Sequence, residues 1–315
     1  MTLHDRENGA RNDGFTLLEV LVASALTVLI AAALLGVSTT MLRNWNRDQG
    51  RLRAAGQARR ILDQIERDLQ DAMCRDSGGV WLAATIQAAG SVNSDWVDGA
   101  KPTASSLDPA AQVLTDARFG VAGVWLRFFT TRLGSDPRTG DASAPVAVAY
   151  QLVRRSRTSG NSDPSYLFYR SESTSAAAHE AGFDLASANY SAASKENGAV
   201  GNLLTPPTRY LLGENVVDFG VRFYSTAVDG AGRRQLVSLF PLSFSDLEYR
   251  AKSPDGPAGE RMPWVVDVVI RILSDEGARM ISELENHRLA GTWWVIALAN
   301  SYVFTRRIVV TVAAP

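Results

Sequence analysis

A long apolar segment near the N-terminus constrains the fold of this chain more than any other feature. Residues 20–42 contain no charged side chain, and Arg43 carries the first charge after them. As an α-helix with a rise of ~1.5 Å per residue, the segment would be about 34 Å long, enough to cross a hydrocarbon core of about 30 Å. It exceeds the apolar region of about 7–15 residues found in cleaved secretory signals, and no small-residue cleavage site follows it. The sequence therefore predicts a retained transmembrane helix.

Glu19 is the one charged residue between Gly14 and Arg43. An acidic side chain is costly within a membrane helix, although less so near the helix end than at its centre. Glu19 either lies in water at the membrane interface or has a cationic partner. If the chain were cut between Gly14 and Phe15, the new ammonium group of Phe15 would lie one helical turn from Glu19, about 6 Å along the axis. An approach to ~4 Å between neighbouring chains would be strongly attractive in a medium of low dielectric constant.

Gly14, Phe15 and Glu19, followed by the apolar segment, resemble the prepilin signature of type IV pilins and type II secretion pseudopilins. The resemblance implies that residues 1–14 are a leader peptide, which a prepilin peptidase removes after Gly14. It also implies N-methylation of Phe15. Residues 15–42 would then be a transmembrane helix through which the chain assembles with other pilin or pseudopilin subunits, guided by Glu19. The leader departs from the family pattern in having Asp13 directly before Gly14.

Charges around the segment leave its orientation open. More arginines follow it than precede it, so the positive-inside rule alone would place the C-terminal part in the cytoplasm. The resemblance instead implies a single-pass inner-membrane protein whose C-terminal part is periplasmic or extracellular. After assembly the protein would be part of a bacterial filament. We adopt this second orientation because a dedicated machinery reads the leader in that family. The basic residues 43–60 form either a solvated helix face or a contact with anionic lipid headgroups.

Apolar residues continue at helical spacing after the segment, which predicts an amphipathic helix over residues 43–76. The expected apolar residues are Ala58, Ile61, Leu62, Ile65, Leu69, Ala72 and Met73. Such a stripe is expected to pack on a sheet. The expected solvated residues are Arg59, Arg60, Asp63, Glu66, Arg67, Asp68 and Asp71. Residues 59–73 resemble the amphipathic half of the long helix in minor pilins and pseudopilins, especially the J-type and W-type subunits.

Residues 77–315 predict a β-rich globular domain, so the expected class is α+β: a long N-terminal helix packed on an antiparallel, β-rich, pilin-like domain. Expected strands are 121–130, 145–155, 166–170, 216–225, 235–244, 265–273 and 302–312, with a helix at 276–289. Residues 77–120 are expected to be irregular and 171–208 to form a long surface loop. Strands 265–273 and 302–312 resemble late strands of J-type pseudopilins. The size and the Ala/Ser-rich insertions also resemble Verru_Chthon cassette protein C.

Few residues suggest catalysis. A net charge of -1 shows no bias toward nucleic acid. The single cysteine, Cys74, cannot form an intrachain disulfide and is read as a partly buried, inert thiol. His4, His179 and His287 lack zinc-ligand spacing, and no nucleophile elbow or phosphate-binding loop occurs. We therefore expect no enzyme activity and no cofactor. Binding of calcium by the acidic loop 253–260 stays open as an alternative.

Trp293-Trp294 has two interpretations: core packing on adjacent strand faces, or an aromatic surface for a partner subunit or a sugar. The function best predicted from the sequence is a structural subunit of a type IV pilus or pseudopilus-like filament. The alternative is a single-pass anchored domain that binds or senses outside the cytoplasm and does not polymerise. An anchored enzyme is a third class, which the poverty of catalytic groups disfavours.

Overall fold

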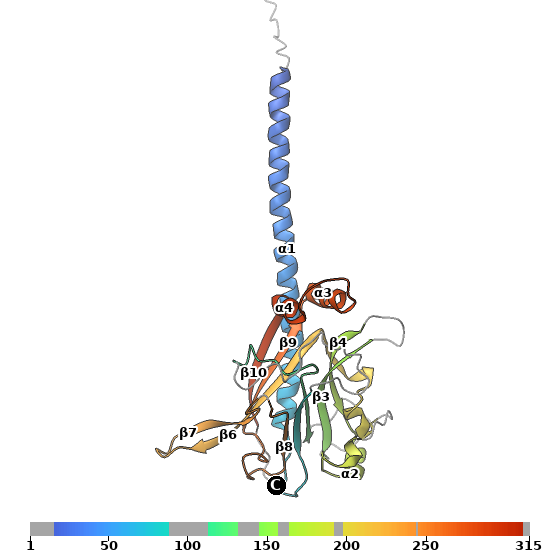
Figure 1. Ribbon diagram of the computed structural model, residues 1–315, viewed down its shortest axis with the longest axis vertical. Helices are drawn as coiled ribbons and strands as arrows, with labels where there is room; N and C mark the ends of the chain where they lie inside the picture. Colours follow the sequence, from blue (N-terminus) through green and yellow to red (C-terminus); the bar gives the residue numbers. More distant parts are fainter. Residues whose placement is uncertain are drawn as a thin grey trace, which may run out of the picture. The chain divides into compact units, whose positions relative to one another are not determined.

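The computed structural model describes residues 16–87, 113–131, 145–156, 164–191, 198–243 and 245–310. The predicted α+β class is confirmed, because an N-terminal apolar helix precedes two antiparallel sheets (Figure 1). The leader lies outside the described residues, and so does the run of turn-forming residues at 134–141, which predicts a hairpin turn between the expected strands 121–130 and 145–155. The chain forms two units, residues 1–49 and residues 50–315.

Helix α1 runs from Leu17 to Gln70 and contributes to both units. In the second unit its apolar stripe (Ala58, Ile61, Leu62, Ile65, Leu69) is buried, as the spacing predicted. The helix ends at Gln70 rather than at the expected position 76, because the next residues pair with β2. The N–H of Met73 donates to the carbonyl of Phe129 at 2.9 Å, and Ala72 forms a β-bridge with Thr130.

The larger sheet has six strands in the order β5-β4-β3-β2-β1-β8, all antiparallel to their neighbours. Its strands are β1 Leu82–Ile86, β2 Val124–Thr130, β3 Val146–Arg155, β4 Ser165–Glu172, β5 Leu211–Glu214 and β8 Glu248–Ala251. The expected strands near β2, β3 and β4 are present. The expectation that residues 77–120 are irregular is wrong for β1, a short Ala-rich strand that β2 and β8 hold on both sides.

The smaller sheet has four strands in the order β10-β9-β6-β7. Its strands are β6 Val216–Val228, β7 Arg234–Phe240, β9 Val265–Leu273 and β10 Ser301–Val309. The sequence Asp229-Gly230-Ala231-Gly232 predicts a turn, and this turn joins β6 to β7, with the N–H of Gly232 donating to the carbonyl of Asp229 at 2.9 Å. Strand β7 ends at Phe240 rather than at the expected position 244, because Pro241 follows and has no N–H to continue the ladder.

One continuous hydrophobic core contains the apolar stripe of α1 and residues from both sheets. Aromatic rings join the sheets at its centre: Phe168 of β4 contacts Phe219 of β6, with ring centroids 4.8 Å apart. The expectation that residues 171–208 form a surface loop is wrong, because part of this segment is buried. It contains helix α2 (Ser175–Ala181) and 3-10 turns at Ala188–Ser191, Val200–Leu203 and Thr208–Tyr210. Several of its apolar residues, among them Leu185, Tyr190 and Leu203, are buried.

Two short helices lie between β9 and β10. Helix α3 spans Asp275–Glu285, and the side chain of Ser274 caps it by accepting a hydrogen bond from the N–H of Gly277. Helix α4 spans Trp293–Ala299, so the strand expected at Trp293-Trp294 is wrong. Both Trp rings are nonetheless core residues, with 1% and 5% of their surface exposed.

Candidate functional site

The predicted assembly residue, Glu19, lies in the first turn of α1. Gly14 and Phe15, the predicted sites of cleavage and N-methylation, lie outside the described residues. The candidate site that the structure describes is therefore the segment from Thr16 to Leu42.

Glu19 forms a capping box with Thr16. The backbone N–H and the hydroxyl of Thr16 donate to Oε2 of Glu19 at 3.0 and 2.9 Å, and the N–H of Glu19 donates to the Thr16 hydroxyl at 3.3 Å. These reciprocal bonds satisfy backbone donors that a helix N-terminus leaves without partners. The Thr-x-x-Glu pattern of residues 16–19 is the sequence signal for this cap.

The carboxylate of Glu19 retains an available acceptor. Both bonds from Thr16 end on Oε2, and within the described part of the chain no donor bonds to Oε1. A carboxylate can accept up to about four hydrogen bonds. The same side chain can therefore cap its own helix and accept a further donor from outside.

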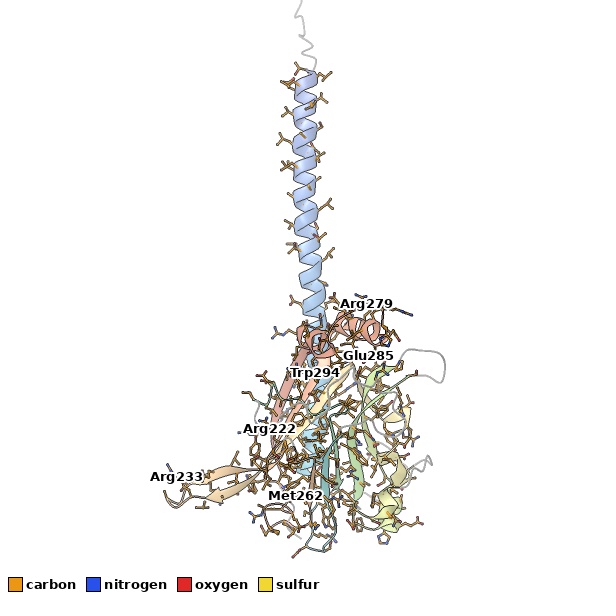
Figure 2. The ribbon with its side chains drawn as sticks, viewed as in Figure 1. Arg222, Arg233, Met262, Arg279, Glu285 and Trp294 are labelled. Carbon is orange, nitrogen blue, oxygen red and sulfur yellow. The ribbon has the colours of Figure 1, made fainter. Side chains whose placement is uncertain are left out.

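After Glu19 the helix has an apolar surface of membrane length. An 18-residue stretch within the span Leu17–Leu42 has a mean hydropathy of 2.6, and every residue of the span is exposed. Figure 2 shows its side chains projecting from all sides of the helix. Among the described residues, this is the one helix that is long and apolar enough to cross a membrane. It could serve as a membrane anchor or as a signal sequence.

Four hydroxyl groups within this span are satisfied by the helix itself. The hydroxyl of Ser24 donates to the carbonyl of Leu21, and that of Thr27 to the carbonyl of Ala23. Thr39 and Thr40 both donate to the carbonyl of Gly36 at 2.9 Å. These four hydroxyl donors are therefore satisfied within the helix, which suits contact with lipid or with apolar helices.

After this span, α1 carries a buried charge, so the expectation that Asp68 lies on the solvated face is wrong. Asp68 is 0% exposed, and Arg170 of β4 donates to its Oδ2 at 2.6 Å. The hydroxyl of Tyr150 donates to the same carboxylate, and Arg170 also pairs with Glu172. Burial and then the charge of Asp68 raise the pKa of Tyr150 well above its ordinary value, which keeps the phenol a neutral donor.

The helical spacing explains the position of Asp68. It comes three residues after Ile65 and seven after Ile61, so it lies on the buried face. A polar residue at such a position is the sequence signal for a buried partner. The partner itself, Arg170, is 102 residues away and follows only from the fold.

Further polar contacts fix the same part of α1 to both sheets. Next to the larger sheet, Gln57 and Arg60 donate to the carbonyls of Glu214 and Leu212. From the smaller sheet, Arg306 of β10 pairs with Asp63 and with Glu66, the latter at 2.8 Å. Residues 57–70 therefore form a helical base that is hydrogen-bonded on several sides.

A second buried ionic group holds α3 against the larger sheet. Arg154 of β3 donates to Oε2 of Glu285 at 2.6 Å, and both side chains are less than one-tenth exposed. The hydroxyl of Tyr166 and the indole N–H of Trp293 donate to the other oxygen, Oε1. Figure 2 labels Glu285 near the top of the second unit. All four side chains are part of the packed interior, so this group is structural.

The residues considered for catalysis are dispersed. Cys74 is buried, and burial raises the pKa of its thiol to about 12, in line with the inert thiol expected. His179 lies in α2, and His287 follows α3. In the loop considered for calcium, Glu260 is paired with Lys252. The described ranges contain no group of three or more His, Cys, Asp or Glu residues placed to hold a metal ion.

Comparison with known proteins finds no matching family model, no matching curated protein and no matching solved structure. The function is therefore inferred from the chain itself.

Proposed function

We propose that this chain is a structural, non-enzymatic subunit of a type IV pilus or type II secretion pseudopilus-like filament. In this proposal a prepilin peptidase removes residues 1–14 and methylates Phe15. The helix 15–42 then anchors the subunit in the inner membrane and packs against the helices of other subunits. The second unit faces the periplasm or the exterior.

One observation carries the proposal: an entirely exposed apolar helix of membrane length has a single acid, Glu19, in its first turn. Such a surface requires lipid or other apolar helices as its neighbours. The available Oε1 of Glu19 supplies an acceptor for the ammonium group of a neighbour's Phe15, which exists only after cleavage. Formation of that ion pair would coincide with helix packing in register.

The base of the helix supports a role in transmitting force. Filament subunits must carry load between the N-terminal helix and the globular part. Here the load would pass through buried Asp68 and through the pairs that Arg306 makes with Asp63 and Glu66.

A second function is favoured by the capping box. Because Thr16 already satisfies one oxygen of Glu19, the acid has a local role that needs no neighbouring subunit. In that case the chain is a single-pass anchored domain that binds or senses outside the cytoplasm and does not polymerise.

Two substitutions separate these functions. Glu19→Gln keeps a side chain that can complete a capping box but removes the negative charge. Thr16→Val, the matched control, removes the capping hydroxyl but keeps the charge of Glu19. Each variant is expressed with the host's own peptidase and filament machinery, and its amount in sheared filaments is compared with its amount in the membrane.

The filament proposal predicts that Glu19→Gln is cleaved and reaches the membrane but is lost from filaments, whereas Thr16→Val is incorporated. Incorporation of Glu19→Gln at the wild-type level would rule out the ion pair. Absence of the wild-type chain from every filament fraction, with normal membrane levels, would favour the anchored domain.

A further inference from the structure

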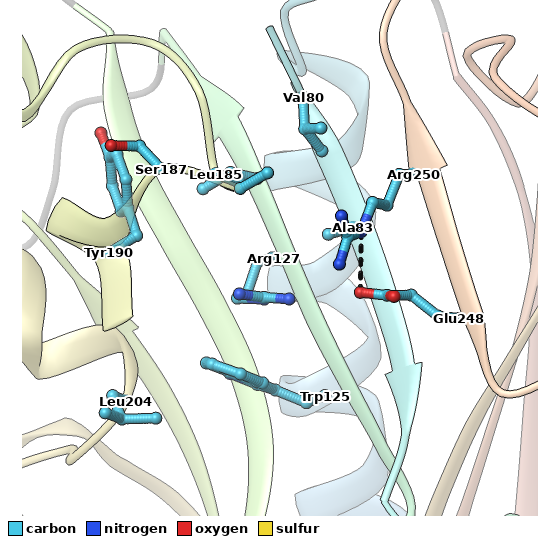
Figure 3. A pocket seen from close by; sticks show the side chains of 11 residues that line it. Val80, Ala83, Trp125, Arg127, Leu185, Ser187, Tyr190, Leu204, Glu248 and Arg250 are labelled. Atoms are coloured by element: carbon cyan, nitrogen blue, oxygen red, sulfur yellow. Dashed lines mark ion pairs between the residues drawn. The ribbon is translucent and has the colours of Figure 1, made fainter. Parts of the chain in front are cut away.

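A small pocket lies on the outer face of the larger sheet. Leu126 of β2 pairs with Tyr150, which pairs with Arg170, and both partners bond to Asp68 of α1, so this row of residues faces the helix. Successive strand residues point to opposite faces, so Trp125 and Arg127 face away from α1. There they line a pocket of about 200 Å³ (Figure 3).

Three parts of the chain form the walls of this pocket. Strand β1 contributes Ala83, and Val80 lies two residues before its start. The segment after α2 contributes Leu185 and Tyr190. Strand β8 contributes Glu248 and Arg250, which pair with each other at 2.9 Å and are partly exposed to solvent. Figure 3 shows this pair on the side of Arg127 opposite to Leu185 and Tyr190.

Two hydrogen-bond donors in the pocket have no acceptor among the residues that the structure describes. The guanidinium carbon of Arg127 lies 3.7 Å from the centroid of the Trp125 ring, so the two groups are stacked. Nε of Arg127 and Nε1 of Trp125 are both buried, and neither has a hydrogen-bond partner within the described residues. A buried donor without an acceptor is unfavourable, and more so when it carries charge.

The charge of Arg127 is only partly compensated. Burial lowers the pKa of its guanidinium to about 10, although the charge of Glu248 acts in the opposite direction. Glu248 is itself paired with Arg250, so the three side chains together carry one excess positive charge. An anion in the pocket would restore the missing acceptor and the missing charge.

We propose that this pocket binds a carboxylate group on a short apolar stem. A guanidinium presents parallel N–H donors that match the two oxygens of a carboxylate. The stem would contact Val80, Leu185 and Leu204, which also line the pocket. A doubly charged phosphate fits less well, because Glu248 repels it and one cation would have to neutralise it. The proposal is independent of filament assembly, since every residue involved lies in the second unit.

Such a group has two sources: a free small acid, or the C-terminal carboxylate of a polypeptide with an apolar last residue. The test uses the full chain in detergent micelles and isothermal titration calorimetry. The probes are isovalerate, isovaleramide as its uncharged counterpart, and a short leucine-ending peptide prepared as the free acid and as the amide.

We expect isovalerate or the peptide acid to bind, with a dissociation constant on the order of 1 mM for a ligand as small as isovalerate. Each amide should bind at least about tenfold more weakly than its acid, because a charge-assisted hydrogen bond is lost. Tighter binding of the peptide acid than of isovalerate assigns the pocket to a polypeptide terminus, and the reverse order assigns it to a free acid.

Variants locate the binding. Arg127→Gln should abolish it. Trp125→Phe, which keeps an aromatic ring at this position but removes the indole N–H, should weaken it. Arg233→Gln is the control, because Arg233 is an exposed arginine in the β6–β7 turn with 80% of its side chain accessible. The proposal is wrong if neither acid binds, if the amides bind as well as the acids, or if Arg127→Gln binds like wild type. The acid–amide comparison on the wild-type chain decides the matter even where a variant misfolds.

Discussion

Replacing Asp68 with asparagine tests how firmly the buried charge holds the base of α1. The carboxylate accepts hydrogen bonds from Gln64 at 3.0 Å, from Nε and Nη2 of Arg170 at 2.6 and 3.3 Å, and from the Tyr150 hydroxyl. Asparagine has the same shape, but one of its two terminal groups donates. In either orientation of the new amide, its NH2 group lies against another donor, either from Arg170 or Tyr150 of the sheet or from Gln64.

The expected cost follows from burial. Removing one partner of a buried ion pair costs about 3–5 kcal/mol, because the other charge is left in the interior. In the variant Arg170 keeps its contact with Glu172. The free energy of unfolding should therefore fall by about 3 kcal/mol, near the lower end of this range. In a domain of this size each kcal/mol lowers Tm by about 2–4 °C, so Asp68→Asn should lower Tm by roughly 6–12 °C.

The matched control is Arg53→Gln, which breaks an ion pair of α1 at the surface. Arg53 and Asp275 lie 3.1 Å apart, but their side chains are 72% and 74% exposed. Such pairs contribute between 0 and about 1 kcal/mol. Thermal unfolding of each full-length variant in detergent is followed by near-ultraviolet circular dichroism. Equal shifts of Tm for the two variants would refute the argument from burial.

Two further predictions concern packing and reactivity. Gly220→Ala should destabilise the second unit by about 1–3 kcal/mol, because the added Cβ would lie 2.0 Å from a ring carbon of buried Phe119. Gly230→Ala, where no atom lies within 4 Å, should be neutral, and equal urea midpoints for the two variants would contradict this. Cys74 should resist iodoacetamide at pH 8 until the chain is denatured, because a thiol with a pKa of about 12 is almost wholly protonated there. If the thiol of the native chain reacts as fast as that of the denatured chain, the expected burial is wrong.

Strong periodicity made much of the fold predictable. Strand β9 is a nearly continuous run of β-branched residues, and the apolar stripe of α1 recurs at helical spacing. Strands β1, β5 and β8 were missed because they are four or five residues long and have no distinctive alternation. Their neighbours in the sheet hold them in place, and such long-range pairing leaves little trace in the local sequence.

The candidate site was predictable in part. Glu19 stands out because it is the one acid of an apolar segment, but its bonds with Thr16 were overlooked. Asp68 was assigned to solvent because acidic residues usually lie there, although its helical position is on the buried face. Trp125 and Arg127 gave no signal, since their stacking depends on which face of β2 the later segments cover.

The N-terminus of the mature protein tests the central claim most directly. Intact-mass and peptide mass spectrometry are applied to the chain purified from the membranes of its native host. The account predicts that the protein begins at Phe15 and carries one added methyl group on its α-amine. A protein that still begins at Met1, or one that begins near residue 43, would contradict it.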